Sequence, residues 1–350
     1  MKNPFIYFTK SIGVDLGTAN SLIYVAGRGI VINEPSIAAI NNKTGQVLAI
    51  GDEAKKMVGR TPAHVTIVRP LVNGVISDFD MTQEMLKYFF KKIGASSGLL
   101  HYNRAVIGVP TNLTEVERKS VEDAVIGAGA KKAYVVEEPL AAAIGARLPI
   151  DQPTSNMIVD IGGGTSEIAV ISMGGIVTSK SLKVAGDRLN EDIIRFVREE
   201  FKLAIGEPTA EELKINIGTA MPGVSEKMDM AVRGRDMATG LPKEIILKDT
   251  HIRAAMSRSI KMILDSIHEV IETTPPELVG DLLRNGIYLA GGGSLMKNFD
   301  KLLERELLVP VHIIDDPLTA VVRGCGIAVE NFDKYYNVVN NPLRPRDIKI

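Results

Sequence analysis

Two aspartates that each precede a glycine turn are the residues of this 350-residue sequence that point most directly to chemistry. Asp15 lies in the segment VDLGT and Asp160 in the segment VDIGG. Glycines let backbone N–H groups approach a ligand closely, and successive amides in a tight turn form a concave site for phosphate oxygens. Two carboxylates that face one another repel unless a cation lies between them, so the pair predicts Mg²⁺, bound through its waters. Either aspartate alone would instead indicate a turn-stabilising residue.

The two segments are copies of one pattern. In both, an apolar stretch ends in aspartate, turns through glycine and resumes as an alternating strand. Two such hairpins about 145 residues apart predict a duplicated domain with a cleft between the copies; a chance match of two ordinary β-hairpins is the alternative. The sequence has neither a GxxxxGK[ST] loop nor a GxGxxG motif. With Asp15 aligned on Asp160, the coinciding residues are Gly17 with Gly162, Ser21 with Ser166, Ile23 with Ile168 and Val25 with Val170.

A third glycine cluster follows the predicted strand 287–290. Gly291, Gly292 and Gly293 precede a helix that we expect to begin at Leu295. A strand–glycine–helix junction offers a helix N-terminus and a close backbone approach, which suits the adenosine part of a nucleotide.

Strand-like and helix-like segments alternate along the chain, which predicts an α/β fold. Apolar residues at helical spacing predict a helix over 80–93 with Asp80 as its N-cap. The capping box Thr114…Glu117 begins another helix, and Pro139 suits the first position of a third. The remaining predicted elements are strands 105–109 and 133–136, helices 186–202 and 249–273, and a β-rich insertion over 224–248.

Composition narrows the classes of function. The chain is 45% hydrophobic and 24% charged, as in ordinary globular proteins, and its net charge of −1 gives no electrostatic case for nucleic acid as a partner. The single cysteine, Cys325, excludes an intrachain disulfide, and the five histidines lack metal-ligand spacing. No apolar run reaches the roughly 18 residues of a membrane span. We therefore expect a cytoplasmic protein.

The motifs resemble those of the superfamily of actin, heat-shock chaperone ATPases and sugar kinases, and more narrowly the MreB family of bacterial actins. GVDLGTAN resembles the first phosphate loop, VDIGGGTSE the second and LAGGGSL the adenosine loop. VEEPLAAAIGA and DPLTAVVRGCG resemble the two helices that connect the domains. Further similar segments, such as RPLVNGVISDF and VRGRDMATGLP, extend the resemblance over almost the whole chain.

The resemblance implies an actin-like fold, in which two ribonuclease-H-like domains flank a nucleotide cleft and each carries a smaller subdomain. ATP with Mg²⁺ would bind in the cleft. The implied subdomains are IA (1–33, 75–148 and 322–350), IB (34–74), IIA (149–185 and 251–321) and IIB (186–250).

The resemblance also assigns roles to residues. Glu138, before Pro139, matches the carboxylate that positions the attacking water, and Thr165 matches the second water-contacting position; Glu137 is the rival carboxylate. Glu211, Glu212 and Lys214 match the segment that contacts ribose and base, although Thr209…Glu212 also fits a helix capping box. The full set implied for nucleotide binding is Gly17, Thr18, Ala19, Asn20, Gly162, Gly163, Gly164, Thr165, Glu211, Glu212, Lys214, Gly291, Gly292 and Gly293, with Asp15 and Asp160 toward the metal.

Two apolar segments suggest membrane contact. Leu99 and Leu100 follow a Ser-Ser-Gly run between a predicted helix and strand, where loops are normally polar, and in MreB relatives the matching loop enters lipid. Phe5, Ile6 and Phe8 lie between Lys2 and Lys10 and could rest on an anionic surface. Packing against the protein core is the alternative for both segments.

Three functions fit the superfamily. The first is a cytoskeletal ATPase that polymerises and guides cell shape or wall synthesis from the inner face of the cytoplasmic membrane. Its partners would be further copies of itself, the membrane and membrane proteins of the elongation machinery. A chaperone ATPase would need a peptide-binding domain, and the chain ends about 20 residues after the last predicted core helix. A sugar or acetate kinase would need a site for the phosphoryl acceptor. The Glu138-Pro139 pair matches the carboxylate that positions a water molecule, which favours the cytoskeletal ATPase.

Overall fold

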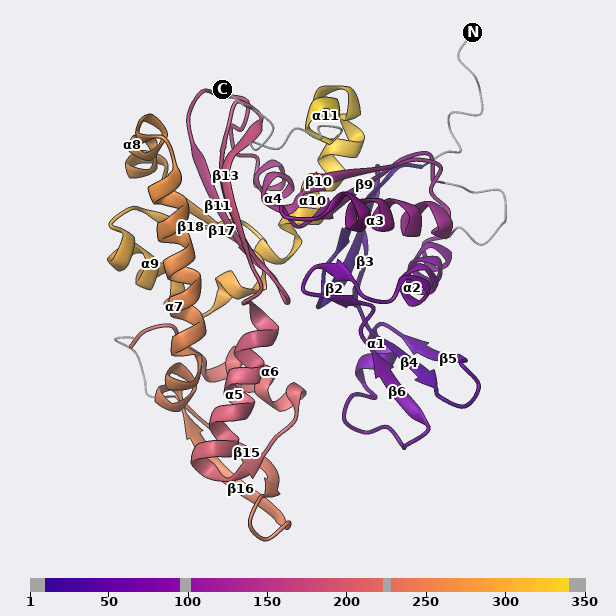
Figure 1. Ribbon diagram of the computed structural model, residues 1–350, viewed down its shortest axis with the longest axis vertical. Helices are drawn as coiled ribbons and strands as arrows, with labels where there is room; N and C mark the ends of the chain where they lie inside the picture. The colour runs from indigo at the N-terminus through magenta and orange to yellow at the C-terminus, as the bar shows by residue number, and fades with distance from the viewer. Residues whose placement is uncertain (1–9, 95–101, 223–227, 340–350) are drawn as a thin grey trace.

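A computed structural model describes residues 10–94, 102–222 and 228–339 of the chain. Two five-stranded sheets form the two halves of the molecule, side by side in Figure 1. The first contains β1 (Ile12–Leu16), β2 (Asn20–Val25), β3 (Gly29–Pro35), β9 (Ala105–Val109) and β10 (Ala133–Glu137), in the order β10-β9-β1-β2-β3. The second contains β11 (Asn156–Ile161), β12 (Ser166–Ser172), β13 (Gly175–Leu182), β17 (Ile287–Ala290) and β18 (Val311–Ile313), in the order β13-β12-β11-β17-β18.

The two sheets are duplicates in strand direction and in register. In each, an antiparallel hairpin (β1–β2 or β11–β12) continues into two parallel strands. Asp15 pairs with Leu22 in the first hairpin, and Asp160 pairs with Glu167 in the second. Both partners lie seven positions after the aspartate, so the structure confirms the predicted repeat.

Helices separate the two sheets and cover their outer faces. The pair α4 (Glu138–Gly145) and α10 (Ala320–Glu330) lies between the sheets in one apolar core with residues of β9, β10, β11 and β12. The helices α2 (Phe79–Lys92) and α3 (Glu115–Ala128) cover the other face of the first sheet. The corresponding cover of the second sheet includes α7 (Asp249–Thr273). The remaining helices of the large halves are α8 (Pro276–Asn285), α9 (Phe299–Leu307) and α11 (Phe332–Val339), with the 3-10 turns η2 (Gly292–Leu295) and η3 (Pro317–Thr319).

Each half carries a smaller unit, and both extend toward the bottom of Figure 1. The first contains a three-stranded sheet, β5-β4-β6, and one short helix. The second contains the sheet β14-β15-β16 and two helices. The bounds are β4 (Ala38–Asn41), β5 (Val47–Ile50), α1 (Asp52–Lys55) and β6 (Val65–Val68) for the first, and α5 (Gly186–Phe201), β14 (Leu203–Ala204), α6 (Glu207–Ile217), β15 (Asp229–Asp236) and β16 (Pro242–Lys248) for the second. A small ribbon, β7 (Leu71–Val72) with β8 (Val75–Ile76), follows β6.

The α/β fold is confirmed, whereas three local predictions about helix starts are wrong. The N-cap of α2 is Asp78 and not Asp80, because the extended backbone at Asp78 lets its carboxylate accept the Met81 N–H at 3.0 Å. The glycines 291–293 lead into the turn η2, and a regular helix begins only at Phe299. Thr209 caps no helix, since α6 already begins at Glu207 after Gly206. The Thr114–Glu117 capping box is confirmed.

The subdomain boundaries stay a prediction, and β3, which belongs to the first large sheet, runs to Pro35. Among the described helices, none combines the length and the apolar character that crossing a bilayer requires.

Candidate functional site

The glycine turns of the two hairpins face one another and are in contact. A Cβ on Gly163 would lie 2.7 Å from the Cβ of Ala19, and one on Gly164 would lie 2.8 Å from the Cα of Asn73. Any side chain at these two glycines would therefore collide with the opposite half. The sequence predicted both turns as phosphate loops, and the structure brings them together.

Thr18, in the first turn, is buried and contacts both halves. Its Oγ1 accepts the N–H of Gly74 at 2.8 Å, and a Cβ on Gly164 would touch the same oxygen. The neighbouring Ala19 is exposed, and the side chain of Asn20 donates to Asn33 at 2.7 Å within the first sheet. Of the predicted residues 17–20, Ala19 is thus the exposed one, and the side chains of Thr18 and Asn20 hold the turn in place.

Four carboxylates lie near one another beside the two glycine turns: those of Asp15, Glu138, Asp160 and Glu167. Burial raises the pKa of Asp15 to about 7. Burial and then the charges of Asp15 and Glu167 raise the pKa of Asp160 to about 8. The pKa of Glu138 is raised well above its usual range, first by burial and then by Glu167, Asp15 and Asp160. Such a concentration of acidic groups is a site that a cation would stabilise.

Asp15 and Asp160 fit the predicted Mg²⁺. They are hard oxygen donors from opposite halves, and within the described residues neither carboxylate has a cationic partner. The described part of the chain contains no group of three or more His, Cys, Asp or Glu side chains placed to hold a metal ion. Two carboxylates without a third ligand suit an ion that keeps most of its waters, as Mg²⁺ does. A bound Mg²⁺ would offset the acidic charge and bind phosphate oxygens.

The raised pKa values predict that the metal-free, nucleotide-free protein becomes less stable as pH rises from 5 to 9. The unfolded chain releases the protons of Asp15 and Asp160 near pH 4, whereas the folded protein holds them to about pH 7 and 8. Between these values the folded state binds more protons, so the free energy of unfolding falls with rising pH. Melting temperatures from scanning fluorimetry should fall, and Asp160→Asn should flatten the curve. Parallel curves for parent and variant would contradict this assignment.

The two predicted water-contacting residues come from opposite halves. Glu138 is the first residue of α4, directly after β10, and a Cβ on Gly108 would lie 3.6 Å from its Cγ. Thr165 directly precedes β12 and is 7% exposed. Its methyl group lies next to Gly74, which belongs to the first half. The pair therefore forms only where the two halves meet.

Two of the three residues predicted to contact ribose and base lie together on α6. Lys214 Nζ donates to Glu211 Oε2 at 2.7 Å and to the Gly186 carbonyl at 3.0 Å. Asn190 donates to the same Glu211 oxygen at 2.6 Å. Glu212 is exposed and shares none of these contacts. The arrangement favours Glu211 and Lys214 over Glu212 as a ligand-facing pair beside the second glycine turn.

The third glycine cluster packs directly on the second hairpin. A Cβ on Gly291 would overlap the Ile161 carbonyl and the Asp160 carboxylate, and one on Gly293 would overlap the Ile161 side chain. Gly291 also has a φ of 75°, which favours glycine. These glycines are therefore required by packing as well as by any ligand, and they place the predicted adenosine loop beside Asp160.

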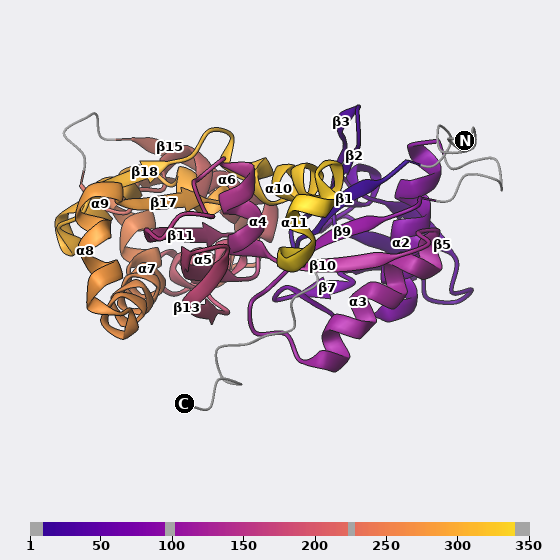
Figure 2. The ribbon, with the colours of Figure 1, turned by 90° about the horizontal axis from the view of Figure 1, so that it is seen from above.

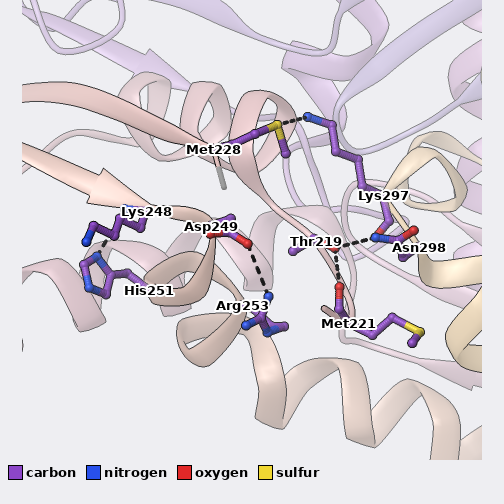
Figure 3. A network of polar contacts seen from close by, with 9 residues as sticks. All are labelled: Thr219, Met221, Met228, Lys248, Asp249, His251, Arg253, Lys297 and Asn298. Atoms are coloured by element: carbon purple, nitrogen blue, oxygen red, sulfur yellow. Dashed lines mark hydrogen bonds and ion pairs between the residues drawn. The ribbon is translucent and has the colours of Figure 1, made fainter. Parts of the chain in front are cut away.

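Beyond this loop, a polar network joins the segment between η2 and α9 to the smaller unit of the second half (Figure 3). The backbone carbonyl of Lys297 accepts bonds from the N–H of Ala220 at 2.9 Å and from the hydroxyl of Thr219 at 3.1 Å. Asn298 Nδ2 donates a hydrogen bond to Thr219 Oγ1 at 3.2 Å, and Lys297 Nζ donates one to the Asn216 carbonyl. The segment after the third glycine cluster is thereby tied to the end of α6.

A cavity of about 590 Å³ separates the sheet β5-β4-β6 from α6. It lies away from the carboxylates, between the two smaller units. At its edge Arg69 forms an ion pair with Glu207, the first residue of α6. This is a direct polar connection between the smaller units. The lining residues are Val58, Gly59, Thr61, Val65, Thr66, Ile67, Arg69 and Glu207.

The residues predicted to contact membrane, Leu99, Leu100, Phe5, Ile6 and Phe8, lie outside the described residues, and their role stays a prediction.

Sequence reasoning also missed contributors to the site. Glu167 and Thr111 form a buried contact between the halves, and Arg69 and Glu207 connect the smaller units. Glu167 stands within the quoted segment VDIGGGTSE, where a charged residue in an apolar strand was the available signal.

Comparisons with known proteins find similar sequences over nearly the whole chain. The family model described as MreB/Mbl protein matches residues 9–337. The cell shape-determining protein Mbl of Bacillus subtilis (strain 168) is 47% identical over 327 residues, which cover 93% of this chain and 98% of the relative. The cell shape-determining protein MreB of Escherichia coli (strain K12) is 44% identical over 332 residues, covering 94% and 95% of the two chains.

Solved structures are similar over the same span. The structure of MreB5 of Spiroplasma citri bound to ADP has a TM-score of 0.89 and 39% identity, covering 94% of this chain and 98% of that one. A structure of MreB5 bound to AMPPNP matches equally well. The MamK double helical filament, at 22% identity, has a TM-score of 0.78 and covers 93% of this chain and 99% of its own. The predicted actin-like fold is confirmed.

Proposed function

Because this chain belongs to the MreB/Mbl family, we propose that it is a cytoskeletal ATPase that polymerises into membrane-associated filaments and contributes to bacterial cell shape and to the guidance of cell-wall synthesis. The observation that carries the proposal is the apposition of two glycine turns, with Asp15, Asp160 and Glu138 behind them. Curated relatives are named as cell shape-determining proteins.

ATP with Mg²⁺ is the proposed ligand. The backbone amides of residues 17–20 and 162–165 would bind phosphate oxygens, and Asp15 and Asp160 would hold the metal. Glu211 and Lys214 would contact the ribose and base, close to Gly291, Gly292 and Gly293. The related structures carry ADP or AMPPNP, which supports a nucleotide at the equivalent place.

Hydrolysis would use the pair from opposite halves. Glu138 would orient the attacking water and accept its proton, and Thr165 would contact the same water. A carboxylate is an effective base when its pKa lies near the working pH, and burial moves the pKa of Glu138 upward from its usual range.

Self-assembly is the primary role in this proposal. Actin-like subunits join head to tail, and such a heterologous contact propagates because it does not close. Closure of the two halves around ATP would favour the subunit shape that fits the polymer.

Electron microscopy of the purified protein with ATP and Mg²⁺ tests the proposal. We expect filaments, together with sedimentation that depends on nucleotide or on a threshold concentration. A protein that stays monomeric at tens of micromolar with every nucleotide would overturn the cytoskeletal assignment. Transfer of phosphate to a sugar or acetate would favour the kinase alternative.

Direct attachment to the cytoplasmic face of the membrane is a further part of the proposal. Leu99 and Leu100, if fully buried in lipid, would contribute about 3–6 kcal/mol before ordering costs, so one subunit would bind the membrane weakly. A filament repeats this leucine pair on every subunit and would thus bind the membrane firmly. Membrane proteins of the elongation machinery would be reached from this surface.

Replacing Leu99 and Leu100 by serine should sharply reduce co-sedimentation with anionic liposomes while ATP binding is kept. Removal of residues 1–8 as well should reduce it further, because Phe5, Ile6 and Phe8 are lost. The parent chain at a concentration too low for filaments is the control for multivalency. If the combined variant pellets with liposomes as the parent does, attachment through these segments is wrong.

A further inference from the structure

Glu167 is a fully buried carboxylate that joins the two halves of the molecule. Its side chain lies on β12 of the second half and is 0% exposed. Its Oε2 accepts the backbone N–H of Thr111 at 3.1 Å and the Thr111 hydroxyl at 2.8 Å, and Thr111 follows β9 of the first half. Its Oε1 accepts the hydroxyl of Ser181, in the second half, at 2.6 Å. One oxygen thus bonds to each half.

The hairpin itself does not need a carboxylate at this position. In the first hairpin the residue at the same register is Leu22, which pairs with Asp15 and is also buried. Burial of a carboxylate is costly where leucine would be favourable, and burial raises the pKa of Glu167. Since the duplicated hairpin folds with leucine, the contacts of Glu167 point to a role specific to the second hairpin.

Thr165 is linked to the same carboxylate. It lies two residues before Glu167 and so on the same side of the extended chain, and hydrogen bonding from its hydroxyl opposes the effect of burial on Glu167. A threonine hydroxyl that donates to a carboxylate offers only its lone pairs to other neighbours. Thr165 Oγ1 is then an acceptor toward a water molecule, as is the carboxylate of Glu138. A water that donates one proton to Thr165 Oγ1 and the other to the Glu138 carboxylate has only its oxygen lone pairs left, and it directs one of them to a third partner.

We propose that Glu167 is a positioning residue for ATP hydrolysis, which couples the contact between the halves at Thr111 to the orientation of the Thr165 hydroxyl. This inference rests on the proposed function, because Glu138 and Thr165 must orient the attacking water. Glu138 comes from the first half and Thr165 from the second. The Thr111–Glu167 contact sets how the halves meet, so the water is held between two acceptors only when that contact is made.

The test compares two variants that each remove one hydroxyl from the same carboxylate. Thr111→Val removes a bond between the halves, and Ser181→Ala removes a bond within the second half. Phosphate release should give a kcat about 10-fold lower for Thr111→Val, with KM and ATP affinity close to those of the parent, because small misplacements of reacting groups are costly. Ser181→Ala should stay within about 2-fold of the parent, and Thr111→Ser should restore turnover.

Substitutions of Glu167 itself provide the second arm. Glu167→Leu places the residue of the first hairpin in the second and should lower kcat about 100-fold while ATP binding is kept. Glu167→Gln keeps one acceptor oxygen, for Thr111, and replaces the other with an N–H₂ donor, so its kcat should lie between those of Glu167→Leu and the parent. Melting temperatures of all variants separate loss of folding from loss of turnover. Thr111→Val and Ser181→Ala provide the result if Glu167→Leu does not fold.

Distinct results would overturn this inference and the proposed function. Equal loss of kcat and melting temperature in Thr111→Val and Ser181→Ala would mean that Glu167 only stabilises the fold, as would unchanged kcat in Thr111→Val and Glu167→Leu. Absence of phosphate release from the parent chain, with ATP bound, would overturn the proposed ATPase and this inference with it.

Discussion

Glu138→Ala is expected to lower the rate of phosphate release by about 10²–10⁴-fold while leaving nucleotide affinity near that of the parent. The reason is a separation of roles at the site. Backbone amides of two turns and the aspartate-bound metal would hold the phosphates, whereas Glu138 would contact only the attacking water. Single-turnover phosphate release measures the rate, and titration with a fluorescent ATP analogue measures affinity.

Glu137→Ala is the matched control for Glu138→Ala. Glu137 is the preceding carboxylate, the last residue of β10, and serves as the N-cap position of α4. We expect its variant to retain turnover. If Glu137→Ala loses turnover and Glu138→Ala keeps it, the two carboxylates have been assigned the wrong way round.

Asp160→Asn is expected to abolish most of the gain in ATP affinity that Mg²⁺ provides, with a loss of about 10–100-fold in the presence of the metal. Asparagine keeps the shape of the side chain and removes the charge that holds the hydrated ion. Without Mg²⁺, ATP should bind to the variant and to the parent about equally at pH 7, because the pKa of about 8 leaves Asp160 largely uncharged in the metal-free parent. Titrations in Mg²⁺ and in EDTA measure both effects.

Asp265→Asn serves as the control for Asp160→Asn. Asp265 is an exposed aspartate on α7 paired with Lys261 at 3.0 Å, and it lies outside the glycine turns. Its variant should show the full Mg²⁺ effect. An undiminished Mg²⁺ effect in Asp160→Asn would place the ion elsewhere.

Local patterns in the sequence were sufficient for the parts of the fold that depend on neighbouring residues. The aspartate–glycine hairpins, the helix opened by Thr114 and the strand before Glu138 all follow from residue type and spacing. The start of α2 was misplaced because Asp78 and Asp80 are both good caps, and the extended backbone at Asp78 decides between them. The glycines at 291–293 suggested a helix start, but their tight packing on Ile161 produces a 3-10 turn.

The connections between the halves could not be predicted in this way. Glu167 and Thr111 are 56 positions apart, and Arg69 and Glu207 are 138 positions apart. A buried carboxylate in a strand is recognisable in a sequence, but its partner is set by how two sheets meet, which no local pattern encodes. The site residues supplied by each hairpin were therefore found, and the residues that align the hairpins were missed.

The position of α10 between the sheets has a consequence for synthesis of the chain on the ribosome. This helix packs against β1 so closely that a Cβ on Gly13 would lie 2.6 Å from the Gly326 nitrogen, and Phe332 of α11 meets the Tyr134 ring edge to face with the ring centres 4.7 Å apart. The first half is therefore completed by the end of the chain, after α4 and the whole second half have been made. At ~5–20 residues per second, the nascent first half waits on the order of ten seconds or more with part of its apolar core uncovered. During translation the core that α10 shares with both sheets is consequently the last part of the molecule to be completed.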